Sequence, residues 1–242
     1  MSKDPLLRVE ELNAAIDGHQ ITHKVEFDVG VNESVGLVGR NGAGKSTTFR
    51  AIMGQVDVLN GSIKFNGEEL TDLTPDEIPR RGVGYQPEDR KLFTGMSIEQ
   101  NIRMPIWASN RPELTDNEDE IINDIFNIFS ELYDHRDQKV ENLSGGQAKM
   151  TSIGRALALQ PDLLILDEPL EGLAPIIVER LKENIAEIIK TTDISVLIAE
   201  ANVRHISEIT DSLVVIDRGE IIASGDPTEI AEDETLQEVM QG

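Results

Sequence analysis

Residues 39–47 read Gly39-Arg40-Asn41-Gly42-Ala43-Gly44-Lys45-Ser46-Thr47, between the apolar run 34–38 and a segment with helical patterning. Glycines at this spacing let the backbone curl, so that successive N–H groups point at phosphate oxygens. Lys45 would bring positive charge to the β- and γ-phosphates, and the Ser46 hydroxyl would bind magnesium. A chance match on a glycine-rich turn is expected in roughly one chain of this length in a hundred. This phosphate loop, taken alone, predicts a nucleoside triphosphate site.

Two acids follow a second apolar run, since residues 163–166 lead directly into Asp167 and Glu168. The carboxyl ends of strands in an open α/β sheet face the ligand crevice. We therefore expect Asp167 to reach magnesium, directly or through water, and Glu168 to act as the catalytic group that polarises the attacking water. An acidic surface turn would be the simpler interpretation without the phosphate loop. With that loop in the same chain, the catalytic interpretation is favoured.

Further apolar runs predict an α/β fold. Four short runs bounded by breakers are typical of buried strands in a largely parallel sheet: residues 34–38, 163–166, 196–199 and 213–216. Near the N-terminus, residues 6–12 and 25–29 indicate antiparallel strands. Two-residue turns at Asn66-Gly67 and Arg218-Gly219 would each close a hairpin.

Helix starts are marked at Thr74-Pro75-Asp76-Glu77 and at Asp226-Pro227-Thr228-Glu229, each with a capping residue and a proline at the first helical position. Between about residues 88 and 155 the pattern becomes helical. Apolar side chains recur there at helical spacing and are expected to be core: Ile121, Ile122, Ile125, Phe126, Phe129, Leu132 and Tyr133. This region predicts a helical insert between two parts of one α/β core.

Composition excludes several classes of protein. No apolar run is long enough to span a bilayer and the N-terminus, MSKDPLLRVEE, lacks a leader pattern, so we expect a soluble, cytoplasmic chain. The absence of cysteine excludes disulfides and thiolate metal sites. With 22 basic and 45 acidic residues the net charge is −23, which disfavours nucleic acid as a partner. This acidity indicates either a solvated face or a salt-rich, halophilic cytoplasm.

A third motif, Leu143-Ser144-Gly145-Gly146-Gln147, precedes a helical run that extends through Leu157. Ser144 is a good N-cap, and two glycines leave the helix start open to a phosphate. In isolation this motif would be interpreted as a helix cap after a glycine turn. Together with the phosphate loop and the acidic strand end, in this order, it resembles the ABC transporter ATPases, whose signature is this LSGGQ segment. The resemblance extends over nearly the whole chain.

That resemblance implies a fold and a mechanism. It implies a single domain over residues 1–242, with a P-loop NTPase core of mostly parallel sheet, an N-terminal antiparallel β subdomain and an α-helical subdomain inserted at about 88–155. ATP and Mg²⁺ would be bound by a dimer of two ABC ATPase subunits, in which each signature segment caps the ATP on the partner's phosphate loop. Integral membrane permease subunits would convert ATP-driven closure into transport, with the ATPase peripheral on the cytoplasmic face of the cell membrane.

One branch of the family is especially similar. The chain resembles the ATPases of branched-chain amino acid importers, and those of the related urea and amide importers, in two segments. These are residues 40–47 and the run Asp167-Glu168-Pro169-Leu170-Glu171-Gly172-Leu173-Ala174-Pro175. Residues 85–90 (YQPEDR) and 96–101 (MSIEQN) add to this match. Such importers pair two different ATPase chains on two membrane chains and are fed by a solute-binding protein, which the ATPase does not contact.

Four positions depart from the family pattern. Ile16 occupies the place of the adenine-stacking aromatic, and it keeps apolar contact without a π-face. Glu88 stands in the slot of the glutamine that reaches magnesium, with Gln86 two residues earlier, and a carboxylate can also serve a cation. Ala201 stands where a histidine usually senses the γ-phosphate, and Ala174 replaces an aspartate of the inter-subunit loop.

We expect His205, about one helical turn beyond Ala201, to be a surface residue and not a substitute for the missing histidine. Slow hydrolysis by the chain alone follows from the two missing groups.

Other functions stay open. They are an export ATPase, a soluble ABC protein of DNA repair or translation, and a binding module without turnover, which the retained Glu168 disfavours. The ABC proteins of DNA repair or translation are disfavoured by three features of the sequence: a single phosphate loop, the lack of a coiled-coil insertion, and the acidic composition.

Overall fold

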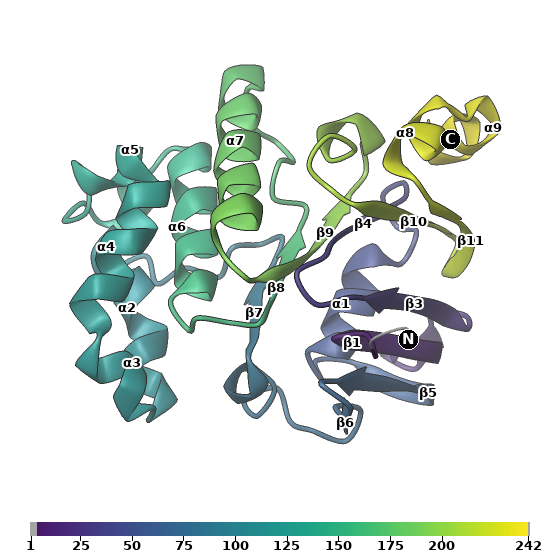
Figure 1. The fold of residues 1–242 in the computed structure, drawn as a ribbon, viewed down its shortest axis with the longest axis horizontal. Coiled ribbons are helices and arrows are strands. Elements are labelled where there is room, and N and C mark those ends of the chain that lie inside the picture. Colours follow the sequence, from purple (N-terminus) through teal and green to yellow (C-terminus); the bar gives the residue numbers. More distant parts are fainter. Residues whose placement is uncertain (1–3, 242) are drawn as a thin grey trace.

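The computed structural model describes residues 4–241, and Figure 1 shows an α/β fold with two sheets. Residues 1–3, which begin the N-terminal stretch without a leader pattern, and residue 242 lie outside the described part. The larger sheet has six strands: β4 (Ser34–Val38), β7 (Val83–Gln86), β8 (Leu163–Asp167), β9 (Ser195–Glu200), β10 (Ser212–Asp217) and β11 (Glu220–Gly225). Their order is β11-β10-β4-β9-β8-β7, and all neighbours are parallel except β10 and β11. The predicted, largely parallel sheet is confirmed.

A second sheet is antiparallel throughout and comes from the N-terminal part of the chain. Its strands are β1 (Leu7–Ile16), β2 (His19–Gln20), β3 (Val25–Val29), β5 (Asp57–Phe65) and β6 (Glu68–Glu69). Helix α1 (Lys45–Ile52) follows β4, and its buried Phe49 and Ile52 share one apolar cluster with residues of both sheets. The antiparallel sheet therefore packs with α1 against the strand that leads into the phosphate loop.

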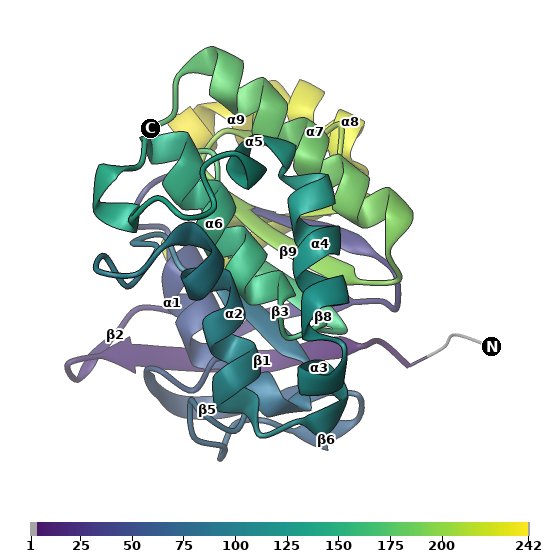
Figure 2. The same ribbon diagram turned by 90° about the vertical axis from the view of Figure 1, so that its left-hand side faces the viewer.

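Five helices lie between β7 and β8 in the chain and gather beside the larger sheet (Figure 1). They are α2 (Ile98–Ser109), α3 (Pro112–Asp116), α4 (Glu118–Ile128), α5 (Ser130–Tyr133) and α6 (Gly145–Leu157), with a 3₁₀ turn at Val140–Asn142. Helices α2, α4 and α6 face the viewer in Figure 2. The predicted apolar stripe is buried except at its last member. Tyr133 is 48% exposed, because α5 ends there at the surface. Its ring lies edge-on to that of Phe126, and the Arg136 guanidinium lies over its face.

The C-terminal part completes the sheet and covers it. Helix α7 (Pro175–Thr191) joins β8 to β9, and α8 (Pro227–Glu232) and α9 (Glu234–Gln241) follow β11. The predicted cap at Asp226 is confirmed, because its Oδ1 accepts hydrogen bonds from the N–H groups of Thr228 and Glu229 at 2.8 and 3.2 Å. Over residues 4–241 no helix has both the length and the apolar character that a membrane span requires.

The helix start predicted at residues 74–77 is wrong. Thr74 makes the expected capping contacts, since its N–H and hydroxyl both donate to a Glu77 carboxylate oxygen. Only turns follow, and then a 3₁₀ helix at Pro79–Arg81. Pro79 lacks the N–H that an α-helix would need there, and its ring would clash with the carbonyl one turn earlier. Gly82, with φ 97°, then ends the segment.

Both predicted hairpin turns are confirmed. Asn66 and Gly67 have φ values of 51° and 78° and join β5 to β6, while Arg218 and Gly219, at 48° and 82°, join β10 to β11. Two successive positive φ values are the geometry whose twist matches paired strands.

Gly36, in the middle of the central strand β4, offers a test of the packing. A Cβ at this position would overlap Leu213 Cδ2 and lie 2.6 Å from Ile206 Cδ1. We expect Gly36→Ala to lower the free energy of unfolding by about 1–3 kcal/mol through overpacking, measured by urea denaturation. Gly95→Ala is the control, because a Cβ there meets nothing within 4 Å. Equal stability of the two variants would contradict this account.

Candidate active site

The phosphate loop closes around the Lys45 side chain. Lys45 is 3% exposed. Its ammonium donates hydrogen bonds to the carbonyl oxygens of Gly39 (2.7 Å) and Arg40 (3.2 Å). Gly42 and Gly44 have φ values of 81° and 112°, in the region that favours glycine. A Cβ at Gly39 would overlap the carbonyl oxygen of Ile216 on β10. Gly42 and Gly44 thus provide the curl that the sequence predicts, and Gly39 lets the loop lie close to β10.

Asp167 ends β8 and meets the first turn of α1. Its Oδ1 accepts a hydrogen bond from Ser46 Oγ at 2.9 Å, and its Oδ2 accepts one from the Tyr85 hydroxyl at 3.2 Å. Burial raises the pKa of the Asp167 carboxyl to about 6, although these hydrogen bonds oppose the rise. The hydroxyl and the carboxylate that the sequence assigns to magnesium are thus in direct contact.

Glu168 has an unusual backbone. Its φ is 47°, a left-handed value that is costly for a residue with a Cβ, and its N–H donates to Ala199 O at 3.0 Å. The side chain lies 3.0 Å (Oε1) from Lys45 Nζ, and both side chains are buried. Burial raises the pKa of Glu168, but hydrogen bonds with Glu171 and Lys45 outweigh it and leave the pKa below its ordinary value. Glu168 is therefore held as a carboxylate beside the loop lysine.

Glu171 is a site residue that the motif analysis did not assign. Carboxylate oxygens of Glu88, Glu168 and Glu171 lie within 4.8 Å of one another. The hydrogen bond to Glu168, together with burial, raises the pKa of Glu171 to about 7, so this group is partly protonated near neutral pH. The only sign in the sequence is an acid three residues after Glu168, at a turn whose direction the sequence does not reveal. An all-oxygen set of this kind, with Ser46 and Asp167 beside it, fits a hard cation such as Mg²⁺.

A cavity of about 390 Å³, a size typical of small-molecule sites, lies beside these groups, and the buried Asp167 is absent from its lining. Its lining comes from the phosphate loop, from the three glutamates and from one apolar residue: Asn41, Gly42, Gly44, Lys45, Ser46, Thr47, Glu88, Glu168, Glu171 and Ile21. Ile16, predicted to contact the base, is half-buried at the end of β1, and Ile21 is the apolar lining residue from this region. Arg40 and Ala43 are absent from the lining. Arg40 Nε lies 3.4 Å from Asp217 Oδ1, and Ala43 is buried.

The signature segment, residues 143–147, forms the start of helix α6, away from the cavity lining. Ser144 caps the helix: its hydroxyl accepts from Gln147 N–H at 3.2 Å, and its own N–H donates to Gln147 Oε1 at 3.0 Å. Leu143 is half-buried, while Ser144 and Gly145 are exposed. Gly146 packs under Ile177, whose Cγ2 would lie 2.6 Å from a Cβ. The segment is thus absent from the lining of its own chain's cavity and open to a second molecule.

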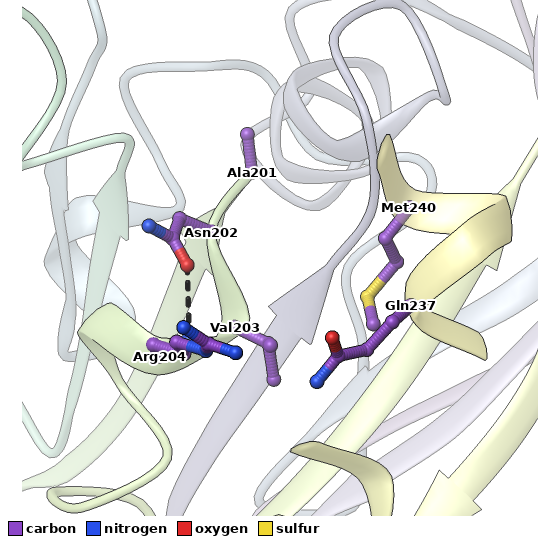
Figure 3. Close-up of a pocket in the computed structure, with 6 residues that line it drawn as sticks. All are labelled: Ala201, Asn202, Val203, Arg204, Gln237 and Met240. Atoms are coloured by element: carbon purple, nitrogen blue, oxygen red, sulfur yellow. Dashed lines mark hydrogen bonds between the residues drawn. The ribbon is translucent and has the colours of Figure 1, made fainter. Parts of the chain in front are cut away.

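The two alanines in family positions lie away from the cavity lining. Ala174 precedes α7 as an N-cap without a side-chain hydrogen bond. Ala201 borders a separate cavity of about 310 Å³ with Asn202, Val203, Arg204, Gln237 and Met240 (Figure 3). His205 is partly buried, its Nδ1 lies 3.7 Å from Glu200 Oε2 at the end of β9, and the residue is absent from the cavity lining.

Comparisons with known proteins agree with this geometry. Residues 22–171 match the family model described as ABC transporter. The branched-chain amino acid transport ATP-binding protein BraG of Pseudomonas aeruginosa is 34% identical over 203 residues, covering 84% of this chain and 85% of BraG. The lipopolysaccharide export ATP-binding protein LptB of Haemophilus influenzae is also 34% identical, over 98% of this chain and 97% of LptB. The ADP conformation of MJ1267, an ATP-binding cassette of an ABC transporter, superimposes with a TM-score of 0.82 at 25% identity, covering 99% of this chain and all of that one.

The buried Asp167 carboxylate should cost stability in metal-free protein. Its pKa rises from 3.8 to about 6 on folding, so the free energy of unfolding falls as the pH rises through this interval, by ~3 kcal/mol in total. Asp167→Asn removes this penalty and should raise stability in EDTA at pH 7.5, with a smaller gain at pH 5. The exposed Asp72→Asn is the control for urea melts at both pH values. A variant less stable than wild type at pH 7.5 would contradict the burial argument.

Proposed function

This chain belongs to the ABC transporter family of ATP-binding subunits and hydrolyses ATP, and we propose that it powers the import of a solute, of the branched-chain amino acid class. The family assignment and the ATPase activity are common to its relatives. The direction of transport, the solute class and the roles of single residues are the proposed part.

The proposed catalytic roles rest on one observation, the contact between the phosphate loop and the end of β8. Ser46 contacts Asp167, and Lys45 contacts Glu168, across more than a hundred residues of sequence. In the proposed mechanism, backbone N–H groups of residues 40–45 and the Lys45 ammonium bind the phosphates. Glu168 orients the attacking water and accepts its proton. Ser46, Asp167 and Glu88 would hold Mg²⁺, which would neutralise the charge that develops on the phosphoryl oxygens.

A dimer completes the proposed site. The exposed start of α6 offers the N–H group of Gly145 and the Ser144 hydroxyl to a phosphate. Because this surface is absent from the chain's own cavity lining, it would serve the ATP of a second ABC ATPase subunit, as the family arrangement implies. ATP would bind the closed dimer better than the open one and so shift the population toward closure.

Import is favoured by the turn that follows Glu168. The run Gly172-Leu173-Ala174-Pro175 resembles the branched-chain amino acid branch, and BraG carries that description in its name. Export is the second candidate, because LptB, a lipopolysaccharide export protein, is as similar to this chain as BraG is. In the import model the partners are a second ATPase chain, membrane permease subunits and, indirectly, a solute-binding protein. The ATPase would lie at the cytoplasmic face of the membrane.

Two substitutions test the catalytic assignment. Glu168→Gln should preserve ATP binding, abolish turnover and leave a closed, ATP-dependent dimer, because the water loses its base while every phosphate contact remains. Lys45→Ala should lose ATP binding itself. Fluorescent-nucleotide titration and size-exclusion chromatography with and without ATP measure both effects. A monomeric Glu168→Gln protein in saturating ATP would contradict the proposed dimer.

The missing histidine and aspartate lead to a prediction for the whole complex. The purified chain should hydrolyse ATP slowly, and kcat should rise by about tenfold or more when it is copurified with its membrane subunits and a partner ATPase that supplies a histidine. Identification of the solute-binding protein in that complex would distinguish import from export. Fast turnover by the isolated chain would contradict the prediction.

A further inference from the structure

Lys149, on the helix that the signature segment begins, is almost fully buried. The residue is 2% exposed, and its Nζ donates a hydrogen bond of 2.5 Å to the carbonyl oxygen of Glu168. A second carbonyl oxygen, that of Glu88, lies 3.4 Å from the same nitrogen. Lys149 therefore contacts the backbone of two proposed site residues from outside the cavity they line.

The backbone that Lys149 contacts is strained and needs support. Glu168 has a left-handed φ of 47°, and the next residue, Pro169, has no N–H with which to bond. On the other side of this turn, the N–H of Leu170 donates to Glu200 Oε1 at 2.9 Å, and Glu200 is also buried. Two buried charged side chains thus hold consecutive parts of the turn, the ammonium on a carbonyl and the carboxylate on an N–H.

Burial of this lysine is costly. No carboxylate lies within 4.0 Å of Lys149 Nζ in the part of the chain that the structure describes, so carbonyl oxygens take the place of a salt bridge. Burial, with the charge of Arg90, lowers the pKa of Lys149. A methionine would fill similar space without desolvating an ammonium. The specific contribution of the lysine is therefore its hydrogen bond to the turn.

We propose that Lys149 is a positioning residue, which holds the Glu168 backbone in its left-handed conformation and so aims the Glu168 carboxylate at the attacking water. This inference rests on the proposed role of Glu168. Lys149 itself touches neither ATP nor water in this scheme.

Helix α6 gives the contact a second consequence. Ser144 caps the helix and Lys149 lies five residues later, about 8 Å along the axis. In the proposed dimer, one helix would therefore contact both the partner's ATP, through its first residues, and the turn that carries Glu168, through Lys149.

Lys149→Met is the main test, with Lys149→Arg as the conservative rescue. In the full chain we expect kcat for ATP hydrolysis to fall tenfold or more, with the Kd for fluorescent ATP and the KM both within twofold of wild type, and Lys149→Arg to recover part of kcat. A loss below threefold would overturn the proposal. So would a Kd that weakens in step with kcat, because that pattern indicates general damage to the site.

Lys182→Met is the matched control, because Lys182 is also largely buried but pairs with Glu179 and Glu208 away from the cavity. It should change kcat less than twofold. Thermal melts accompany every variant. If Lys149→Met melts more than 10 °C below wild type, Lys149→Leu, which has no donor for the Glu168 carbonyl, takes its place under the same criteria.

A double variant separates this proposal from the proposed function. Glu168→Gln and Glu168→Gln/Lys149→Met should form the ATP-dependent dimer equally well, because Lys149 acts on hydrolysis and not on closure. Loss of the dimer only in the double variant would overturn the positioning role. Loss of the dimer already in Glu168→Gln would count against the proposed function instead.

Discussion

A single close contact between two distant parts of the chain underlies the site: the first turn of α1 meets the end of β8. Ser46 bonds to Asp167, and Lys45 pairs with Glu168 in a buried setting where an unpaired charge of either sign would be strongly unfavourable. Strands β4 and β8 are not neighbours, because β9 lies between them. The contact therefore depends on the register of three strands at once, and a one-residue slip in any of them would turn these side chains away.

Acidic groups outnumber cations in this cavity, and the arrangement limits the resulting repulsion. Glu88, Glu168 and Glu171 crowd together, and only Lys45 among the cavity-lining residues offers a full positive charge. The raised pKa of Glu171 reduces the negative charge of this group near neutral pH, and the Lys45 pair offsets the charge of Glu168. A triphosphate adds further negative charge, so a divalent cation bound with it is an electrostatic requirement as much as a chemical one.

Local patterns predicted much of the molecule, and the failures have physical causes. The strand at residues 34–38, both hairpin turns and the caps at Ser144 and Asp226 depend on short-range chemistry, and all are confirmed. The helix expected after Thr74 failed because Pro79 lies beyond the signal that began it. Strand β7 is four residues long and mixed in polarity, so only its pairing with β8 defines it. Glu171 and Lys149 could not be placed, because a glutamate in a turn and a lysine on a helix are usually solvated.

The strand order has a consequence for synthesis on the ribosome. Strand β4, which carries the phosphate loop, lies between β9 and β10, and both are made from the last fifth of the chain. Until about residue 200 has left the exit tunnel, both edges of β4 are unpaired and the loop has no acids in register with it, and the second edge stays unpaired until about residue 217. A growing chain thus has to keep its central strand from pairing with other polypeptides, and nucleotide cannot stabilise the fold until β9 has been made and has brought β8 into register.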